Sequence, residues 1–175
     1  FKKNPSGIEL KSSENENNAR NDLLNLFQNN KIPSEQILGN LGLFLDSKHL
    51  ARILLMDHLF KLSVGVHGDV FEFGTRWGQN SSLFSALRGI YEPFNRHKKI
   101  VVFDTFEGFP SVHPKDGKHQ MMFKGALKTH ENYEKFLEKI LNTQEKFNPL
   151  SHIKKCEIVK GDAIKTFPEY IDKNP

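Results

Sequence analysis

The feature that most constrains the fold is a short apolar run that passes through a glycine turn directly into a helical pattern. In VFEFGTRWGQNSS, which begins at Val70, the two glycines stand four apart, and Glu72 precedes the first of them by two positions. From Asn80 to Tyr91 apolar residues recur at helical spacing, and Pro93 ends the pattern. The order strand, tight turn, helix predicts one unit of a parallel sheet.

Two further units follow along the chain. The run from Ile100 to Phe103 is continuously apolar, which is typical of a strand covered on both faces. A long loop and an amphipathic segment, ENYEKFLEKILNTQEKF, come next, and CEIVKGDA predicts a third strand. Thr166 and Glu169 stand at capping-box spacing and predict the start of another helix. Alternation of strands and helices implies right-handed crossovers.

The predicted fold class is therefore α/β, with a three-layer, doubly wound, Rossmann-like sheet. Three strands make half of such a sheet, so we expect the chain to be truncated after the third strand and to be part of a longer protein, because it also begins with Phe1 and not Met. We divide it into a polar tail at 1–20, an N-terminal helical segment at 21–66, and half of the Rossmann-like domain at 67–175.

Composition excludes several classes of protein. The net charge of +4 arises from 25 basic and 21 acidic residues without a block of like charges, so we expect no nucleic-acid partner, and mild attraction to an anionic ligand. No run approaches the roughly 20 apolar residues that span a bilayer, so we expect no membrane association. The single cysteine, Cys156, cannot form an internal disulfide, which favours a reducing, cytoplasmic location.

The glycine turn indicates a ligand site. Ligands of open parallel sheets bind beyond the carboxyl ends of the strands, where glycine lets backbone amides come close. The spacing here is ExGxxxG, which differs from the GxGxxG of dinucleotide sites and from a phosphate-binding loop. An acid follows or ends each predicted strand: Glu72, Asp104 and Asp162. Such acids suit ribose hydroxyls and the adenine amine, and they favour a nucleoside with a positive group.

These residues also carry a family resemblance. The ExGxxxG turn resembles the first motif of class I S-adenosylmethionine-dependent methyltransferases. More narrowly, GDVFEFGTRWGQNSSLF, VVFDTFEGFP and VKGDAIKTFPE, in that order, are similar to the macrocin O-methyltransferase family, whose members methylate sugar hydroxyls. The resemblance covers residues 66 to 169. A related group of bacterial proteins shares the wording FEFGTRWGQN.

The resemblance implies a cofactor-binding role for a set of residues. It places Gly74 to Gly78 around the methionine portion of S-adenosylmethionine, Glu72 at its ammonium group, Asp104 at the ribose and Asp162 near adenine. Ser81 and Ser82 would meet the cofactor carboxylate. The complete set implied is Glu72, Gly74, Thr75, Gly78, Ser81, Ser82, Asp104, Thr105, Phe106, Gly161 and Asp162.

The resemblance also implies S-adenosylmethionine-dependent O-methylation of a sugar or glycan-like acceptor. The family's Mg²⁺ would be held by ligands outside this chain, and the catalytic residues are not identified from the sequence. The alternatives are an NAD or nucleotide-sugar-binding oxidoreductase and a non-catalytic cofactor-binding module. We expect a small-molecule or glycan-like substrate, and an exposed sheet edge favours a homo-oligomer.

Two groups of residues keep more than one interpretation. Arg76 and Trp77, inside the glycine turn, either shape the mouth of the pocket or contact a partner. His113, Asp116 and His119 lie three apart and could suggest a metal site, but the proline and glycine between them favour a solvated loop.

Overall fold

The structure is a computed structural model that describes residues 12–117, 119 and 121–174. The chain divides into two compact units, Phe1–Leu54 and Leu55–Pro175. The second unit contains the sheet and every predicted site residue.

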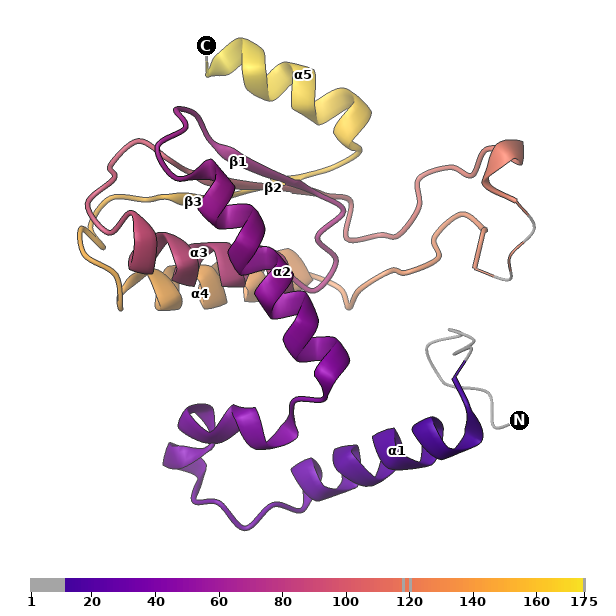
Figure 1. The fold of residues 1–175 in the computed structure, drawn as a ribbon. Helices are drawn as coiled ribbons and strands as arrows, with labels where there is room; N and C mark the ends of the chain where they lie inside the picture. Colours follow the sequence, from indigo (N-terminus) through magenta and orange to yellow (C-terminus); the bar gives the residue numbers. More distant parts are fainter. Residues whose placement is uncertain (1–11, 118, 120, 175) are drawn as a thin grey trace. The chain divides into compact units, whose positions relative to one another are not determined.

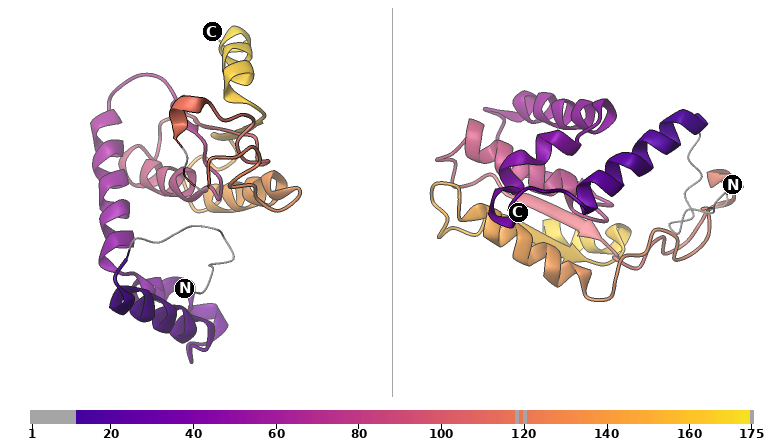
Figure 2. Two further views of the ribbon diagram at one scale, coloured as in Figure 1. Left: turned by 90° about the vertical axis from the view of Figure 1, so that its right-hand side faces the viewer. Right: turned by 90° about the horizontal axis from the view of Figure 1, so that it is seen from below.

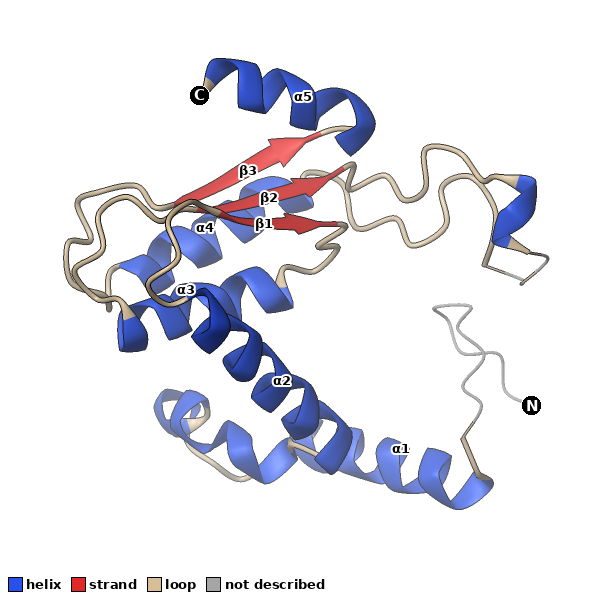
Figure 3. Cartoon of the chain, turned by 45° about the horizontal axis from the view of Figure 1, so that its top comes forward, coloured by secondary structure: helices blue, strands red, loops and turns tan. Residues whose placement is uncertain are grey.

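The second unit is built on a parallel sheet. In the described part of the chain, β1 (Val70–Phe73), β2 (Ile100–Asp104) and β3 (Cys156–Lys160) form one sheet in the order β1-β2-β3. Val70 pairs with Ile100, and Ile100 pairs with Cys156, so the strands run in register. Figure 3 shows the three arrowheads at one edge of the sheet. The three strands predicted from the sequence are therefore confirmed.

Helices cover both faces of this sheet. The helices α3 (Gln79–Tyr91) and α4 (Tyr133–Glu145) lie on one face, and α5 (Ala163–Lys173) lies on the other (Figures 1 and 2). This arrangement confirms the predicted three-layer α/β fold. The helices follow their strands directly, so α3 begins where the glycine turn of β1 ends and α5 begins just after β3.

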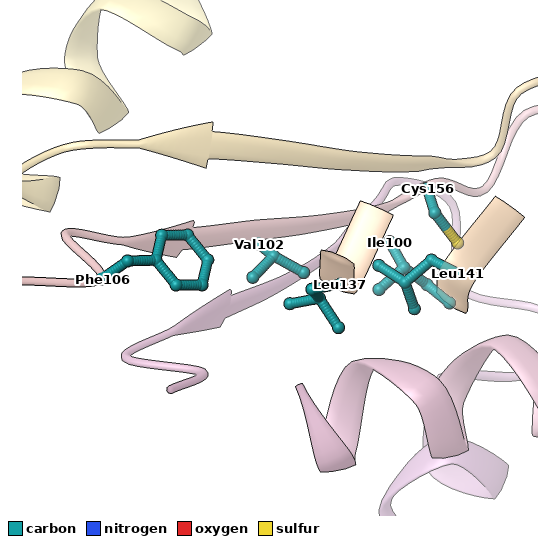
Figure 4. Packing of buried hydrophobic residues seen from close by; sticks show 6 residues of the cluster. All are labelled: Ile100, Val102, Phe106, Leu137, Leu141 and Cys156. Atoms are coloured by element: carbon teal, nitrogen blue, oxygen red, sulfur yellow. The ribbon is translucent and has the colours of Figure 1, made fainter. Parts of the chain in front are cut away.

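The central strand explains why both faces are covered. All four side chains from Ile100 to Phe103 are fully buried, and they alternate between two cores. Ile100 and Val102 pack with Leu137 and Leu141 of α4 (Figure 4). Val101 and Phe103 pack toward α5, in the second core cluster. Burial of each such aliphatic side chain stabilises the fold by roughly 1.5–3 kcal/mol.

Phenylalanine dominates the core on the α5 side. The ring of Phe71 lies 5.9 Å from Phe103 and 5.5 Å from Phe167, both edge to face. Phe73 stacks on Phe103 at 5.1 Å. Edge-to-face and offset rings fill the space between strand and helix on this side of the sheet.

A cluster of buried charges lies near the amino ends of the strands. Arg88, near the end of α3, and Lys155, just before β3, are almost completely buried, and both contact Glu145 at the end of α4. Lys155 Nζ lies 2.9 Å from Glu145 Oε1 and also donates to the carbonyls of Pro149 and Leu150. One carboxylate lies between two cations, and the two carbonyls accept from Lys155, which makes the burial of these charges tolerable.

The first unit contains helical segments only, among its described residues. It comprises α1 (Glu14–Gln28), the 3₁₀ segments η1 (Ser34–Gln36) and η2 (Leu38–Phe44), and the first part of α2 (Ser47–Ser63). The predicted polar tail ends at residue 20, but α1 already begins at Glu14. The reason is a capping box, in which Ser13 and Glu16 each accept the other's backbone N–H. The part of the tail at 1–11 lies outside the described residues.

One predicted helix start needs correction. The start at Thr166 is wrong, because α5 begins at Ala163, where the Asp162 side chain caps it by accepting from the Ile164 N–H at 3.1 Å. The helix α2 is capped in a similar way by Asp46, whose carboxylate accepts from the His49 N–H at 2.8 Å. Both carboxylates are short side chains suited to this position.

None of the helices in the described ranges is long and apolar enough to cross a membrane.

Candidate functional site

The site is built where the three strands end together. The Gly74 N–H donates to the carbonyl of Phe103 at 2.8 Å, and the Gly161 N–H donates to the carbonyl of Asp104 at 2.9 Å. These bonds continue the ladders of the sheet by one residue beyond β1 and β3. The glycine turn, Asp104 and Gly161 are therefore brought side by side, as the sequence predicted for the carboxyl edge of the sheet.

The glycines of the turn serve different purposes. Gly74 and Gly78 both have left-handed backbone, with φ of 76° and 79°, a conformation in which glycine carries no steric penalty. A Cβ on Gly78 would lie 2.1 Å from Leu137 Cδ1, so Gly78 allows the turn to pack on α4. A Cβ on Gly74 would meet nothing within 4 Å. The space above Gly74 is open to a ligand.

Glu72 is a half-buried carboxylate among neutral donors. Its Oε2 accepts from the Thr75 hydroxyl at 3.0 Å. Burial raises the pKa of Glu72, while hydrogen bonds from Thr75, Asn80 and Ser81 act in the opposite direction. Among the described residues no cationic side chain lies within 4 Å of it. Such a carboxylate is suited to an external positive group. Asn80 was not predicted as a site residue, although it lies at the start of α3, just after the glycine turn that follows Glu72.

Asp104 connects two turns. Its Oδ2 accepts from the Arg76 N–H at 2.7 Å, and its Oδ1 accepts from the Phe106 N–H at 2.6 Å. Arg76 and Phe106 both have left-handed backbone, with φ of 54° and 57°, which is strained for residues that carry a Cβ. The carboxylate therefore holds the glycine turn and the loop after β2 in fixed positions relative to each other.

The serines at the start of α3 lie behind the turn. Ser81 is fully buried, and its hydroxyl donates to the carbonyl of Gly78 at 2.9 Å. Ser82 is half-buried, and its N–H donates to the same carbonyl at 3.0 Å. Thr75 is also buried, at 8% exposed. The Thr75 hydroxyl donates to Glu72 and the Ser81 hydroxyl donates to Gly78, so both hydroxyls form hydrogen bonds within or next to the turn.

The remaining predicted residues shape the ends of β2 and β3. The Thr105 hydroxyl donates to the Gly108 carbonyl at 2.7 Å, and Phe106 turns its ring into the core beside α4. Gly161 has φ of 141°, and a Cβ there would lie 2.7 Å from Thr166 Cγ2. Asp162 caps α5. The structure therefore brings all the predicted site residues to one edge of the sheet, with several of them engaged in holding the loops.

An aromatic cluster beside the turn was not predicted. The rings of Trp77 and Tyr133 meet edge to face at 4.9 Å, and the Tyr133 hydroxyl donates to the Trp77 carbonyl at 3.1 Å. Burial raises the pKa of Tyr133. The His130 ring lies 6.3 Å from Trp77. The only available signal was a tryptophan inside a turn that otherwise favours small residues.

The long loop after β2 is fixed at its base. Two backbone hydrogen bonds join the outgoing and returning arms of the loop at its base. The Phe109 N–H donates to the Ala126 carbonyl at 3.1 Å, and the Gly125 N–H donates to the Phe109 carbonyl at 2.9 Å. Beyond this base the loop extends away from the sheet (Figure 1). A shallow hollow in it is lined by Phe109, Ser111, Val112, Asp116 and Met122.

The histidines of this loop are exposed, as expected for a solvated segment. His113, Asp116 and His119 all face solvent, and His113 and Asp116 form a capping box around a short 3₁₀ turn. Across the described residues, no three His, Cys, Asp or Glu side chains gather closely enough to hold a metal ion.

Comparison with known proteins relates this geometry to two solved structures. No family model matches the chain, and no curated protein matches it. The chain is similar to the crystal structure of CalS11, a calicheamicin methyltransferase, with 35% identity and a TM-score of 0.92 over 95% of this chain. It is also similar to the apo structure of CalS11, there described as a TDP-rhamnose 3'-O-methyltransferase of calicheamicin biosynthesis, with 31% identity and a TM-score of 0.80 over 95% of this chain. The chain spans 65% and 64% of the lengths of these two structures.

Proposed function

We propose that the chain belongs to the macrocin O-methyltransferase-like group of class I methyltransferases and that the protein transfers a methyl group from S-adenosylmethionine to a hydroxyl of a sugar. The similarity to CalS11 over 95% of this chain supports both parts of the proposal. The observation that carries the proposal is the meeting of Glu72, Gly74 and Asp104 at one edge of a parallel sheet. The similarity to a TDP-rhamnose methyltransferase supports a sugar attached to a nucleotide as the acceptor class.

In this proposal the cofactor lies over Gly74. The open space above this glycine admits the methionine portion, and Glu72 faces its ammonium group. Asp104 receives the ribose hydroxyls on lone pairs that its two backbone donors leave free, since a carboxylate can accept about four hydrogen bonds. Gly161 and Asp162 border the adenine. Thr75, Ser81, Ser82, Thr105 and Phe106 hold the backbone that surrounds the cofactor.

When bound, S-adenosylmethionine would supply a sulfonium methyl group to the acceptor oxygen: the C–O bond would form in line as the S–CH₃ bond breaks, S-adenosylhomocysteine would leave as a neutral thioether, and the hydroxyl proton would pass to water. The residues of this chain contribute by position. The clamp at Asp104 and the left-handed turn at Arg76 keep the binding groups at fixed distances before the ligand arrives, which lowers the entropic barrier.

Calorimetric titration of the full-length protein with S-adenosylmethionine, and with NAD as a control, tests the proposal. We expect binding of S-adenosylmethionine alone. Incubation with TDP-rhamnose and mass spectrometry of the product should then show the gain of one methyl group. A folded protein that fails to bind S-adenosylmethionine would contradict the proposed function, and binding of NAD instead would favour the oxidoreductase.

The non-catalytic alternative has a distinct outcome in the same experiment. A protein that binds S-adenosylmethionine tightly but methylates neither TDP-rhamnose nor related nucleotide sugars would be a cofactor-binding module.

A cytoplasmic location accords with the single, buried Cys156 and is tested by fractionation of cells. Size-exclusion chromatography with light scattering tests the proposed homo-oligomer.

A further inference from the structure

Arg76 is the residue of the glycine turn whose side chain the proposed cofactor contacts leave unexplained. Its backbone N–H is used by Asp104, but its guanidinium has no acidic partner: within the described residues, no carboxylate oxygen lies within 4 Å of it. Its Nε is buried and has no hydrogen-bond partner. A buried donor on a charged group without an acceptor is costly, roughly 1–3 kcal/mol or more.

The guanidinium is nevertheless held in place. Its Cζ lies over the indole of Trp77, 5.2 Å from the ring centroid. Trp77 is itself fixed on α4 by the Tyr133 ring and hydroxyl. An arginine stacked on an aromatic ring keeps its planar donors free at the edge, which is the arrangement used to bind carboxylates and phosphates.

The backbone of Arg76 also indicates a specific role. A left-handed φ of 54° would be least strained for glycine, and the turn uses glycine at its other two left-handed positions, 74 and 78. An arginine at such a position costs about 1 kcal/mol or more of backbone strain. The Asp104 carboxylate offsets this cost by accepting from the Arg76 N–H, which leaves the side chain, with its unpartnered Nε, for a ligand that accepts from it.

We infer that Arg76, supported by Trp77, binds an oxyanion of a ligand at the mouth of the site. The inference rests on the proposed function, which supplies two sources of this chemistry: the carboxylate of S-adenosylmethionine and the diphosphate of a nucleotide-linked sugar. The carboxylate is planar and each phosphate is tetrahedral, and a guanidinium can bind two oxygens of either group in bidentate fashion. Because no carboxylate pairs with the guanidinium among the described residues, its donors are available to either one.

The test is calorimetric titration of the full-length wild-type protein, Arg76→Gln and Arg76→Lys with four ligands. S-adenosylmethionine is compared with methylthioadenosine, which lacks the carboxylate, and TDP is compared with thymidine, which lacks the phosphates. Arg76→Gln keeps the length and removes the charge, and Arg76→Lys keeps the charge and removes the planar fork. Arg96→Gln is the matched control, because Arg96 is an exposed arginine in the loop before β2, at the other end of the sheet.

If the cofactor carboxylate is the ligand, Arg76→Gln weakens binding of S-adenosylmethionine on the order of tenfold to a hundredfold and leaves methylthioadenosine unchanged. If the diphosphate is the ligand, the same loss appears with TDP and not with thymidine. In either case Arg76→Lys is intermediate and Arg96→Gln has no effect.

Equal affinities of the wild-type protein and Arg76→Gln for S-adenosylmethionine and TDP would overturn the inference. Circular dichroism establishes that each variant is folded, and Arg76→Lys serves as the informative variant should Arg76→Gln not fold. Failure of the wild-type protein itself to bind S-adenosylmethionine would instead contradict the proposed function. The two failures are therefore distinguished.

Discussion

The two ends of the sheet hold buried charge in opposite ways. Near the amino ends, Arg88, Glu145 and Lys155 are almost completely buried and are paired with one another. At the carboxyl ends, Glu72 has neutral donors only, and the Arg76 guanidinium has no carboxylate partner among the described residues. The charges at the amino ends have ionic partners within the protein, whereas we expect those at the carboxyl ends to gain partners from a ligand.

This difference separates structural charge from functional charge. The amino-end cluster stabilises the fold through ion pairs that already form within the protein, although Arg88 Nε has no hydrogen-bond partner. Unpaired groups at a strand end reduce the stability of the free protein, and a ligand that supplies the opposite charge recovers that energy as binding. Substitutions at the amino end should therefore change stability alone, and those at the carboxyl end should change binding as well.

The largest effect on stability is expected for Glu145→Gln. Removing the shared carboxylate leaves Arg88 and Lys155 buried without their partner, which should lower the free energy of unfolding by about 3–5 kcal/mol. Denaturation by urea measures this change. Affinity of the folded variant for S-adenosylmethionine should equal that of the wild-type protein.

Glu138→Gln is the matched control on the same helix. Glu138 pairs with Lys154 at 3.1 Å, and both side chains are about half exposed. Its loss should change stability by less than about 1 kcal/mol. If the two variants have similar stability, the amino-end cluster does not act as a paired structural unit.

The next effect comes from the two glycines of the turn. Gly78→Ala places a Cβ against the buried Leu137 in a left-handed residue and should cost about 2–3 kcal/mol of stability. Gly74→Ala meets no atom and should cost only the backbone strain, about 1 kcal/mol. Gly74→Ala should nevertheless weaken S-adenosylmethionine binding at least tenfold, on the order of the 1–3 kcal/mol typical of overpacking.

Gly65→Ala isolates the contribution of backbone strain. Gly65 has φ of 76°, the same as Gly74, and also has open space around it, but it lies in the loop before β1. We expect a similar loss of stability from both substitutions and a loss of binding only from Gly74→Ala. Unchanged binding by Gly74→Ala would exclude the cofactor from the space above that residue.

Asp104→Ala should affect both properties. Two backbone N–H groups of strained residues lose their acceptor, which should reduce stability by roughly 2 kcal/mol, and binding of S-adenosylmethionine should be lost. Asp104→Asn keeps one acceptor but points an amide N–H₂ at the other donor, so it should be intermediate. Thermal unfolding without ligand separates the two roles: if Asp104→Ala unfolds like the wild-type protein, the carboxylate does not act as a clamp.

Much of the carboxyl end could be predicted from the sequence. The continuous run at Ile100–Phe103 and the glycine spacing at Gly74 and Gly78 are local patterns, and each reports its own strand or turn. Because parallel strands end at the same edge, Asp104 and Gly161 could be placed beside the turn without coordinates.

The contacts between distant segments could not be predicted in this way. The pairing of Arg88 with Glu145, 57 positions apart, depends on how α3 packs on α4, and an isolated Arg in a helical pattern indicates only an exposed face. The role of Asp104 as a clamp between two turns depends on the left-handed φ of Arg76 and Phe106, a backbone conformation that neither residue type favours. The sequence predicts too late a start for α5 because Thr166 and Glu169 also match a capping box, whereas the residue that caps the helix is Asp162.

The smallest change in stability is expected for Glu72→Gln, and it should depend on pH. Burial raises the pKa of Glu72 above its ordinary value of 4.5 in the folded protein, so folding favours the protonated carboxyl. This contribution is fully present below pH 4.5 and is lost as the pH rises through the folded pKa. Glutamine resembles the neutral form, so the variant should match the wild-type protein at low pH and be slightly more stable at pH 8.

Binding should change in the opposite sense. Glutamine cannot compensate the ammonium group of S-adenosylmethionine, so affinity at pH 8 should fall on the order of tenfold, even though the free variant is the more stable protein. Glu107→Gln is the control, because Glu107 is exposed in the loop after β2, and it should alter neither the stability nor the affinity. A Glu72→Gln protein that is less stable at pH 8 and binds normally would show that Glu72 belongs with the paired charges of the amino end, because its charge would then be serving the fold and not a ligand.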